Sequence, residues 1–123
     1  MTNAGIQTTP FKDTANAPYE QDLSFSSGIS NFQMPAAIAT VAAMNGYVPP
    51  ATDQAFTYID MGCGIGITIN ALASIYPKAQ FIGVDFNPQH IEAGRQTATD
   101  HDLQNVAFIE GSFSGISAED LPK

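Results

Sequence analysis

The residues best suited to chemistry form one glycine-rich stretch, Asp60–Gly66, in which an acidic residue stands two places before the first of three glycines. Glycine allows tight turns and lets a ligand approach the main chain where a Cβ would collide. The apolar spacing after the stretch predicts a helix, whose amino end offers free N–H groups and a positive dipole. Open α/β sheets bind ligands beyond the carboxyl ends of their strands. The stretch therefore predicts a ligand site.

The glycine spacing indicates which kind of nucleotide-like ligand the stretch would bind. A dinucleotide fingerprint, G-x-G-x-x-G, would place its third glycine where Ile67 stands, whereas this chain has G-x-G-x-G. Asp60 would repel a pyrophosphate and attract an ammonium group. The pattern therefore favours a nucleoside with a cationic end, and an NAD-binding oxidoreductase is the less favoured alternative.

A second acidic residue, Asp85, ends the next expected strand. An acidic residue about 20 positions after the first glycine can accept hydrogen bonds from ribose hydroxyls. The alternative role for Asp85 is to cap the helix that begins at Pro88, but Asn87 is better placed to do so. We therefore expect Asp85 to bind ribose.

Three strands and three helices are expected to position these residues. The periodicity predicts a buried strand over 56–61, further strands over 81–85 and 106–110, and helices from Pro35 to a stop at Gly46, from Ile65 to Pro77, and from Pro88 to about Thr99. This alternation is typical of an α/β fold with a Rossmann-like parallel sheet and flanking helices, here with only its first three strands. We expect residues 1–33 to be a loosely structured leader or lid and residues 34–123 to be the partial domain.

Three segments together resemble the class I S-adenosylmethionine-dependent methyltransferases. They are 58–66 (YIDMGCGIG), 81–86 (FIGVDF) and 105–113 (NVAFIEGSF), in the order and spacing of that family over residues 54–113. The resemblance implies that the chain binds S-adenosyl-L-methionine and is the cofactor-binding half of a methyltransferase. A non-catalytic nucleoside-binding or regulatory module is the alternative.

The resemblance also implies which residues contact the cofactor. The three glycines would line its methionine portion, Asp60 would lie near its ammonium group, Asp85 would hold the ribose, and the remaining residues would border the adenine or complete the loop. The full set is Asp60, Gly62, Cys63, Gly64, Gly66, Asp85, Phe86, Gly111, Ser112 and Phe113. Ser112 departs from the family, in which many members carry an acidic residue at that position. No catalytic residue and no methyl acceptor is predicted.

The sheet is expected to have an open edge. The chain ends just where a fourth strand should begin, which would leave the first strand without a neighbour on one side. We therefore expect either a fragment of a longer methyltransferase or self-association through that edge. The leader resembles segments that fold over the cofactor in some methyltransferases, and Tyr19 is the residue expected to make such a contact.

Composition limits the remaining possibilities. The 123 residues include 4 basic and 12 acidic side chains, giving a net charge of −8, so a basic patch for nucleic acid is excluded. No apolar run approaches the length of a membrane span, and a single cysteine fits a cytoplasmic protein.

We expect His90 and His101 to be solvated surface residues and predict no metal site. Cys63 is expected to fill a tight turn; the nearby helix terminus could lower its pKa, but no base is paired with it.

Overall fold

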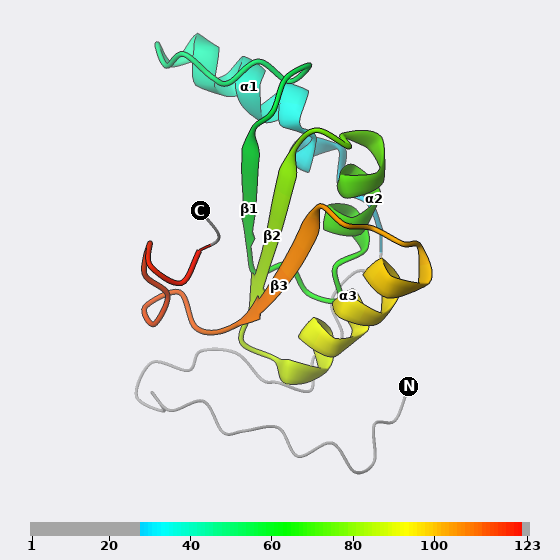
Figure 1. The fold of residues 1–123 in the computed structure, drawn as a ribbon. Helices are drawn as coiled ribbons and strands as arrows, with labels where there is room; N and C mark the ends of the chain where they lie inside the picture. The colour runs from blue at the N-terminus through cyan, green and yellow to red at the C-terminus, as the bar shows by residue number, and fades with distance from the viewer. Residues whose placement is uncertain (1–27, 122–123) are drawn as a thin grey trace.

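The computed structural model describes residues 28–121, which form a three-stranded parallel sheet with helices between the strands (Figure 1). The sheet order follows the sequence order. Its elements are β1 (Thr57–Met61), α2 (Ile67–Ile75), β2 (Gln80–Asp85), α3 (Pro88–Asp100) and β3 (Val106–Glu110). The predicted α/β fold with a Rossmann-like sheet is confirmed.

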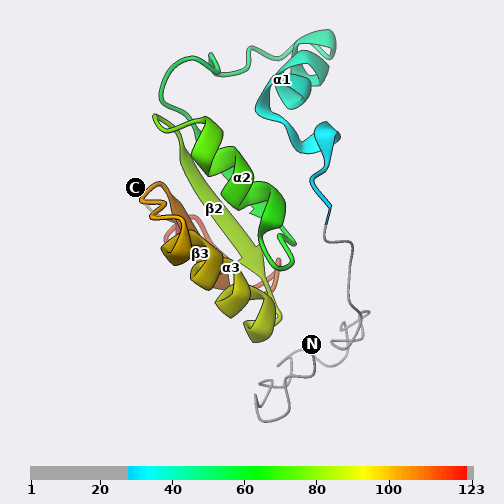
Figure 2. The same ribbon diagram turned by 90° about the vertical axis from the view of Figure 1, so that its right-hand side faces the viewer.

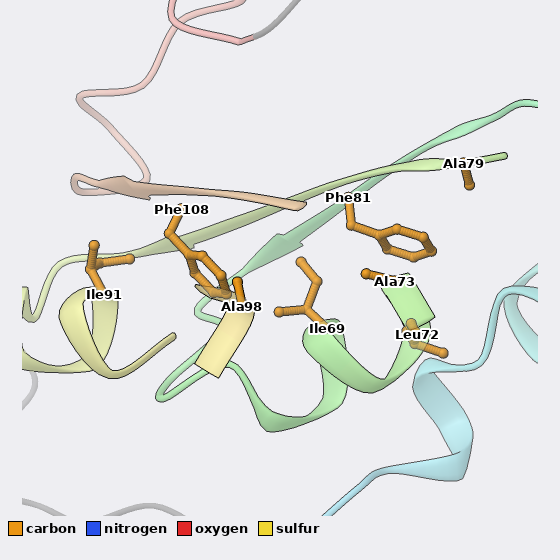
Figure 3. Close-up of a cluster of buried hydrophobic side chains, with 8 residues drawn as sticks. All are labelled: Ile69, Leu72, Ala73, Ala79, Phe81, Ile91, Ala98 and Phe108. Carbon is orange, nitrogen blue, oxygen red and sulfur yellow. The ribbon is translucent and has the colours of Figure 1, made fainter. Parts of the chain in front are cut away.

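Helices α2 and α3 cover the same face of the sheet (Figure 2). Between them and the strands lies a core of eight buried apolar side chains, Ile69, Leu72, Ala73, Ala79, Phe81, Ile91, Ala98 and Phe108 (Figure 3). Tyr58, Phe81 and Val106 are aligned across the three strands, and all three pack on this core. Alternation along each strand therefore also brings Asp60, Asp85 and Glu110 to the helix-covered face.

The prediction that the first strand is buried was wrong. In β1, Thr57, Ile59 and Met61 are exposed, and the strand begins at Thr57 rather than at residue 56. The physical reason is its position, since among residues 28–121 it pairs with β2 alone and forms the edge of the sheet. An apolar pattern cannot distinguish an edge strand from a central strand. Self-association through this edge stays a prediction.

Helix α2 begins two residues later than the apolar spacing predicted. Gly66 precedes the helix in the left-handed region, with φ of +78°, so Ile65 belongs to the glycine loop rather than to the helix. The apolar spacing alone had placed Ile65 in the helix. The positive φ values of Gly64 and Gly66 show that the backbone there is not helical.

Residues 30–33 form hydrogen bonds to α2 and to β1. The Ser30 N–H donates to Thr68 Oγ1 at the start of α2 (3.4 Å), and the Tyr58 hydroxyl donates to the Gln33 carbonyl (2.9 Å). Residues 30–33, which include the short 3₁₀ helix η1 (Asn31–Gln33), therefore lie beside α2 and β1. Tyr19 lies outside the described residues, so its expected contact with the cofactor stays a prediction.

Helix α1 (Pro35–Met44) presents an uncharged apolar surface. Pro35 occupies its first turn and Gly46, with φ of +85°, follows its end, as predicted. Val41, Met44 and other apolar side chains of this region are exposed. From residue 28 to residue 52 the chain has no Asp, Glu, Lys, Arg or His. None of the helices within residues 28–121 is long and apolar enough to cross a membrane.

Asn105, just before β3, fixes the carboxyl end of α2. Its Nδ2 group donates to the carbonyls of Ala73, Tyr76 and Ala79 at 3.0, 3.1 and 3.0 Å. Asn105→Ala leaves these carbonyls without that donor and is expected to lower the free energy of unfolding by about 1–3 kcal/mol. Urea denaturation followed by circular dichroism measures the loss. Gln104→Ala, which removes only an exposed bond to Asp102, is the control, and equal losses in the two variants would contradict the prediction.

Candidate functional site

The glycine loop between β1 and α2 lies at the carboxyl end of the sheet. Gly62 has φ of +89° and Gly64 has φ of +58°, conformations that most residues other than glycine rarely adopt. The N–H groups of Gly62 and Cys63 both donate to the Val84 carbonyl, at 2.7 and 2.9 Å, which holds the loop against β2. A Cβ at Gly64 would meet no atom within 4 Å, so the main chain in the middle of the loop faces open space. The loop therefore leaves open space beside its backbone at Gly64, and binding of a ligand there stays a prediction.

Asp85 joins the glycine loop to the loop after β2. Its Oδ2 accepts the Gly64 N–H at 2.9 Å, and its Oδ1 accepts the Asn87 N–H at 2.9 Å. Asn87 in turn caps α3 by accepting the Gln89 N–H at 2.9 Å, which confirms the predicted cap. An ionised carboxylate has about four acceptor positions, and with the His90 contact described below three of them are taken, which leaves about one for a ribose hydroxyl. The ribose role itself stays a prediction.

His90, on the first turns of α3, was predicted to be a solvated surface residue, and that prediction was wrong. Its Nδ1 lies 3.3 Å from Asp85 Oδ1, and its side chain is only 16% exposed. His101, at the other end of α3, is exposed as predicted. The sequence held a signal for this difference, because Asn87 and Pro88 fix the helix start and place His90 in its first turns, above the strand end.

The carboxyl ends of all three strands carry acidic residues on the same face. Asp85 is the register partner of Glu110. Asp60 on β1 is the register partner of Gly83, two residues before Asp85. Burial raises the pKa of Asp60, and the charge of Asp85 raises it further. A cation beside Asp60 would offset this effect, because a nearby positive charge favours the ionised carboxylate.

The segment after β3 approaches the same loop. The Gly111 N–H donates to the Asp85 carbonyl (3.0 Å), and a Cβ at Gly62 would lie 3.4 Å from Cζ of Phe113. The Ser112 hydroxyl accepts the Gly115 N–H at 3.1 Å within its own turn. The carboxyl ends of parallel strands lie at the same end of a sheet. The structure therefore brings the three predicted segments together there, namely 60–66, 85–86 and 111–113 (Figure 1).

Three glycines from different segments pack closely around the ring of Phe108. Ideal Cβ atoms at Gly66, Gly83 and Gly94 would lie 2.6, 3.0 and 2.5 Å from the nearest atoms of the Phe108 ring. The glycine loop, β2 and α3 therefore all contact Phe108 with bare backbone. Sequence inspection had given no role to Gly83 or Gly94.

Cys63 is a partly buried free cysteine in the glycine loop. Burial, followed by the charges of Asp85 and Asp60, raises its pKa to about 12. The suggestion that a helix terminus lowers this pKa was therefore wrong. That Cys63 has no nucleophilic role stays a prediction. At pH 8 we expect iodoacetamide to label the native chain about a thousandfold more slowly than the chain in guanidinium chloride, because only the thiolate reacts. The chain has one cysteine, so mass spectrometry reports it directly; comparable rates in both conditions would refute the prediction.

Comparison with protein families gives a match to a family model described as "Methyltransferase domain", over residues 52–122. An uncharacterized protein of Synechocystis, sll1526, is 34% identical over 110 residues, which are 89% of this chain and 22% of that protein. The tRNA (guanine-N(7)-)-methyltransferase of Rubrobacter xylanophilus is 38% identical over 61 residues, 50% of this chain and 27% of that enzyme.

Among solved structures, PKMT2 from Rickettsia typhi in complex with AdoHcy is similar to this chain, with a TM-score of 0.63 and 30% sequence identity. The likeness covers 81% of this chain and 18% of PKMT2. The chain thus spans about a fifth of the length of the first of these relatives and of PKMT2.

Proposed function

Because the chain belongs to the methyltransferase-domain family, we propose that it binds S-adenosylmethionine at the carboxyl end of its sheet. The resemblance that the three sequence segments indicated is confirmed, and S-adenosylmethionine is the cofactor of that family. The observation that carries the proposal is the junction made by Asp85, whose carboxylate holds the glycine loop at Gly64 and the loop after β2 at Asn87.

The residues at this end of the sheet fit such a cofactor. The open backbone at Gly64 leaves room for the methionine portion, and the raised pKa of Asp60 reflects a partly buried carboxylate that a cationic ammonium group would stabilise. We assign the ribose to Asp85. The adenine is assigned to Phe86 and to the segment Gly111, Ser112 and Phe113, which reaches Gly62.

We further propose that the longer protein of which such a domain forms part transfers a methyl group to an acceptor that this chain does not identify. The cofactor supplies the methyl group on a sulfonium that leaves readily. The residues of this chain bind and orient it, and positioning of this kind is a large part of catalysis. We assign residues 34–123 to this domain and residues 1–33 to a leader or lid.

Calorimetric titration of the 123-residue chain with S-adenosylmethionine, S-adenosylhomocysteine and NAD⁺ tests the proposal. Saturable binding of the two adenosyl ligands is expected, without binding of NAD⁺, because Ile67 stands where a dinucleotide site has its third glycine. Binding of NAD⁺ alone, or of none of the three by a folded sample, would overturn the proposal for this chain.

A further inference from the structure

The Asp85 carboxylate needs partners to fix its orientation. The terminal torsion of an aspartate is broad, so the direction of its lone pairs depends on what surrounds it. Two partners are backbone N–H groups, from Gly64 and Asn87, and each belongs to a loop. The side-chain partner is His90, which projects from a regular helix.

The chemistry of this contact assigns the proton. An ionised carboxylate can only accept hydrogen bonds, so Nδ1 of His90 must carry the hydrogen when it bonds to Oδ1 of Asp85 at 3.3 Å. The side chains are 16% and 8% exposed, which leaves little space for water to replace the imidazole. Helix α3 holds the ring in place, since Asn87 caps the helix and Ile91, the next residue, is buried in the core.

We propose that His90 is a positioning residue that orients the Asp85 carboxylate toward the ribose of the cofactor. This inference rests on the proposed function. Through Asp85, His90 sets cofactor affinity without touching the cofactor, and it makes α3 part of the binding site. His101 on the same helix is exposed and provides a matched comparison.

The first test needs no cofactor. Nitrogen-15 NMR of the two histidine rings in the free chain reports which nitrogen carries the hydrogen in the neutral form. We expect the Nδ1–H form for His90, its loss in Asp85→Ala, which removes both acceptor oxygens, and no such preference for His101. The same tautomer pattern in both histidines would overturn the contact on which the proposal depends.

The second test is calorimetry with S-adenosylmethionine. His90→Ala is expected to weaken binding about three- to tenfold, the scale of one hydrogen bond. His90→Gln, whose amide can donate to Asp85, should recover most of the loss, and His101→Ala should cause none. In an Asp85→Ala background, which lacks the acceptor oxygens, His90→Ala should add no further loss.

The outcomes separate this inference from the proposed function. If Asp85→Ala weakens binding but His90→Ala does not, or if the two losses simply add, the role of His90 is overturned and the cofactor site stands. If the wild-type chain binds no S-adenosylmethionine, the proposed function falls and the cofactor role of His90 falls with it, whatever tautomer the NMR shows.

Discussion

Asp85→Asn is expected to weaken S-adenosylmethionine binding by tenfold or more. The substitution keeps the size of the side chain and one acceptor oxygen, but it removes the charge that strengthens hydrogen bonds from ribose hydroxyls. Hydrogen bonds to charged groups contribute about 1.5–3 kcal/mol, which corresponds to roughly 10- to 150-fold in affinity. Calorimetry at constant pH and ionic strength measures the change.

Asp53→Asn is the matched control for this variant, because it makes the same change of charge at an exposed residue before β1. It should leave affinity unchanged. The Asp85 carboxylate also holds Gly64 and Asn87, so the melting temperature of each variant must be compared with that of the wild type. Unchanged affinity in a folded Asp85→Asn chain would refute the ribose assignment.

Gly94→Ala is expected to destabilise the fold, although helices usually favour alanine over glycine. In an exposed helix this change stabilises by up to about 1 kcal/mol. Here the new Cβ would lie 2.5 Å from Cε1 of Phe108, a buried ring that also contacts Gly66 and Gly83. Overpacking of this kind costs about 1–3 kcal/mol, and for a domain of this size each kcal/mol lowers the melting temperature by roughly 4–8 °C. Thermal and urea unfolding measure the loss.

Two further variants show whether the ring is the cause. Phe108→Leu should recover part of the loss when combined with Gly94→Ala, because the smaller side chain leaves room for the Cβ. Gln96→Ala, at an exposed position of the same helix, should change stability by no more than about 0.5 kcal/mol. A Gly94→Ala chain more stable than the wild type would contradict the packing argument.

Local patterns predicted most of the fold. Asn87 and Pro88 marked the start of α3, Gly46 marked the end of α1, and the alternation of strands and helices indicated a parallel sheet. The exposure of β1 could not be predicted from its own residues, although the number of expected strands did predict an open edge beside it. It depends on how many strands flank Ile59 and Met61, and that number is a property of the whole sheet rather than of the segment.

The candidate site was predicted as three segments, but their interactions were not. Motifs placed Gly64 and Asp85 near the same ligand, whereas the structure adds a direct hydrogen bond between them. The direction of the Cys63 pKa was mistaken because the argument from the helix terminus omitted burial and two nearby carboxylates, which are known only from the packing. His90 was missed because its position in the first turns of α3, which Asn87 and Pro88 indicate, was not related to the strand end at Asp85.

The uncharged surface of α1 affects how separate molecules of the chain attract one another in solution. At neutral pH a net charge of −8 makes separate molecules repel one another, although residues 28–52 contribute nothing to that charge. Near the isoelectric point of about 4.2 the repulsion vanishes, while Phe32, Val41 and Met44 remain as exposed as before. Attraction between these apolar surfaces is then unopposed, so mildly acidic buffers should precipitate this chain well before they unfold it.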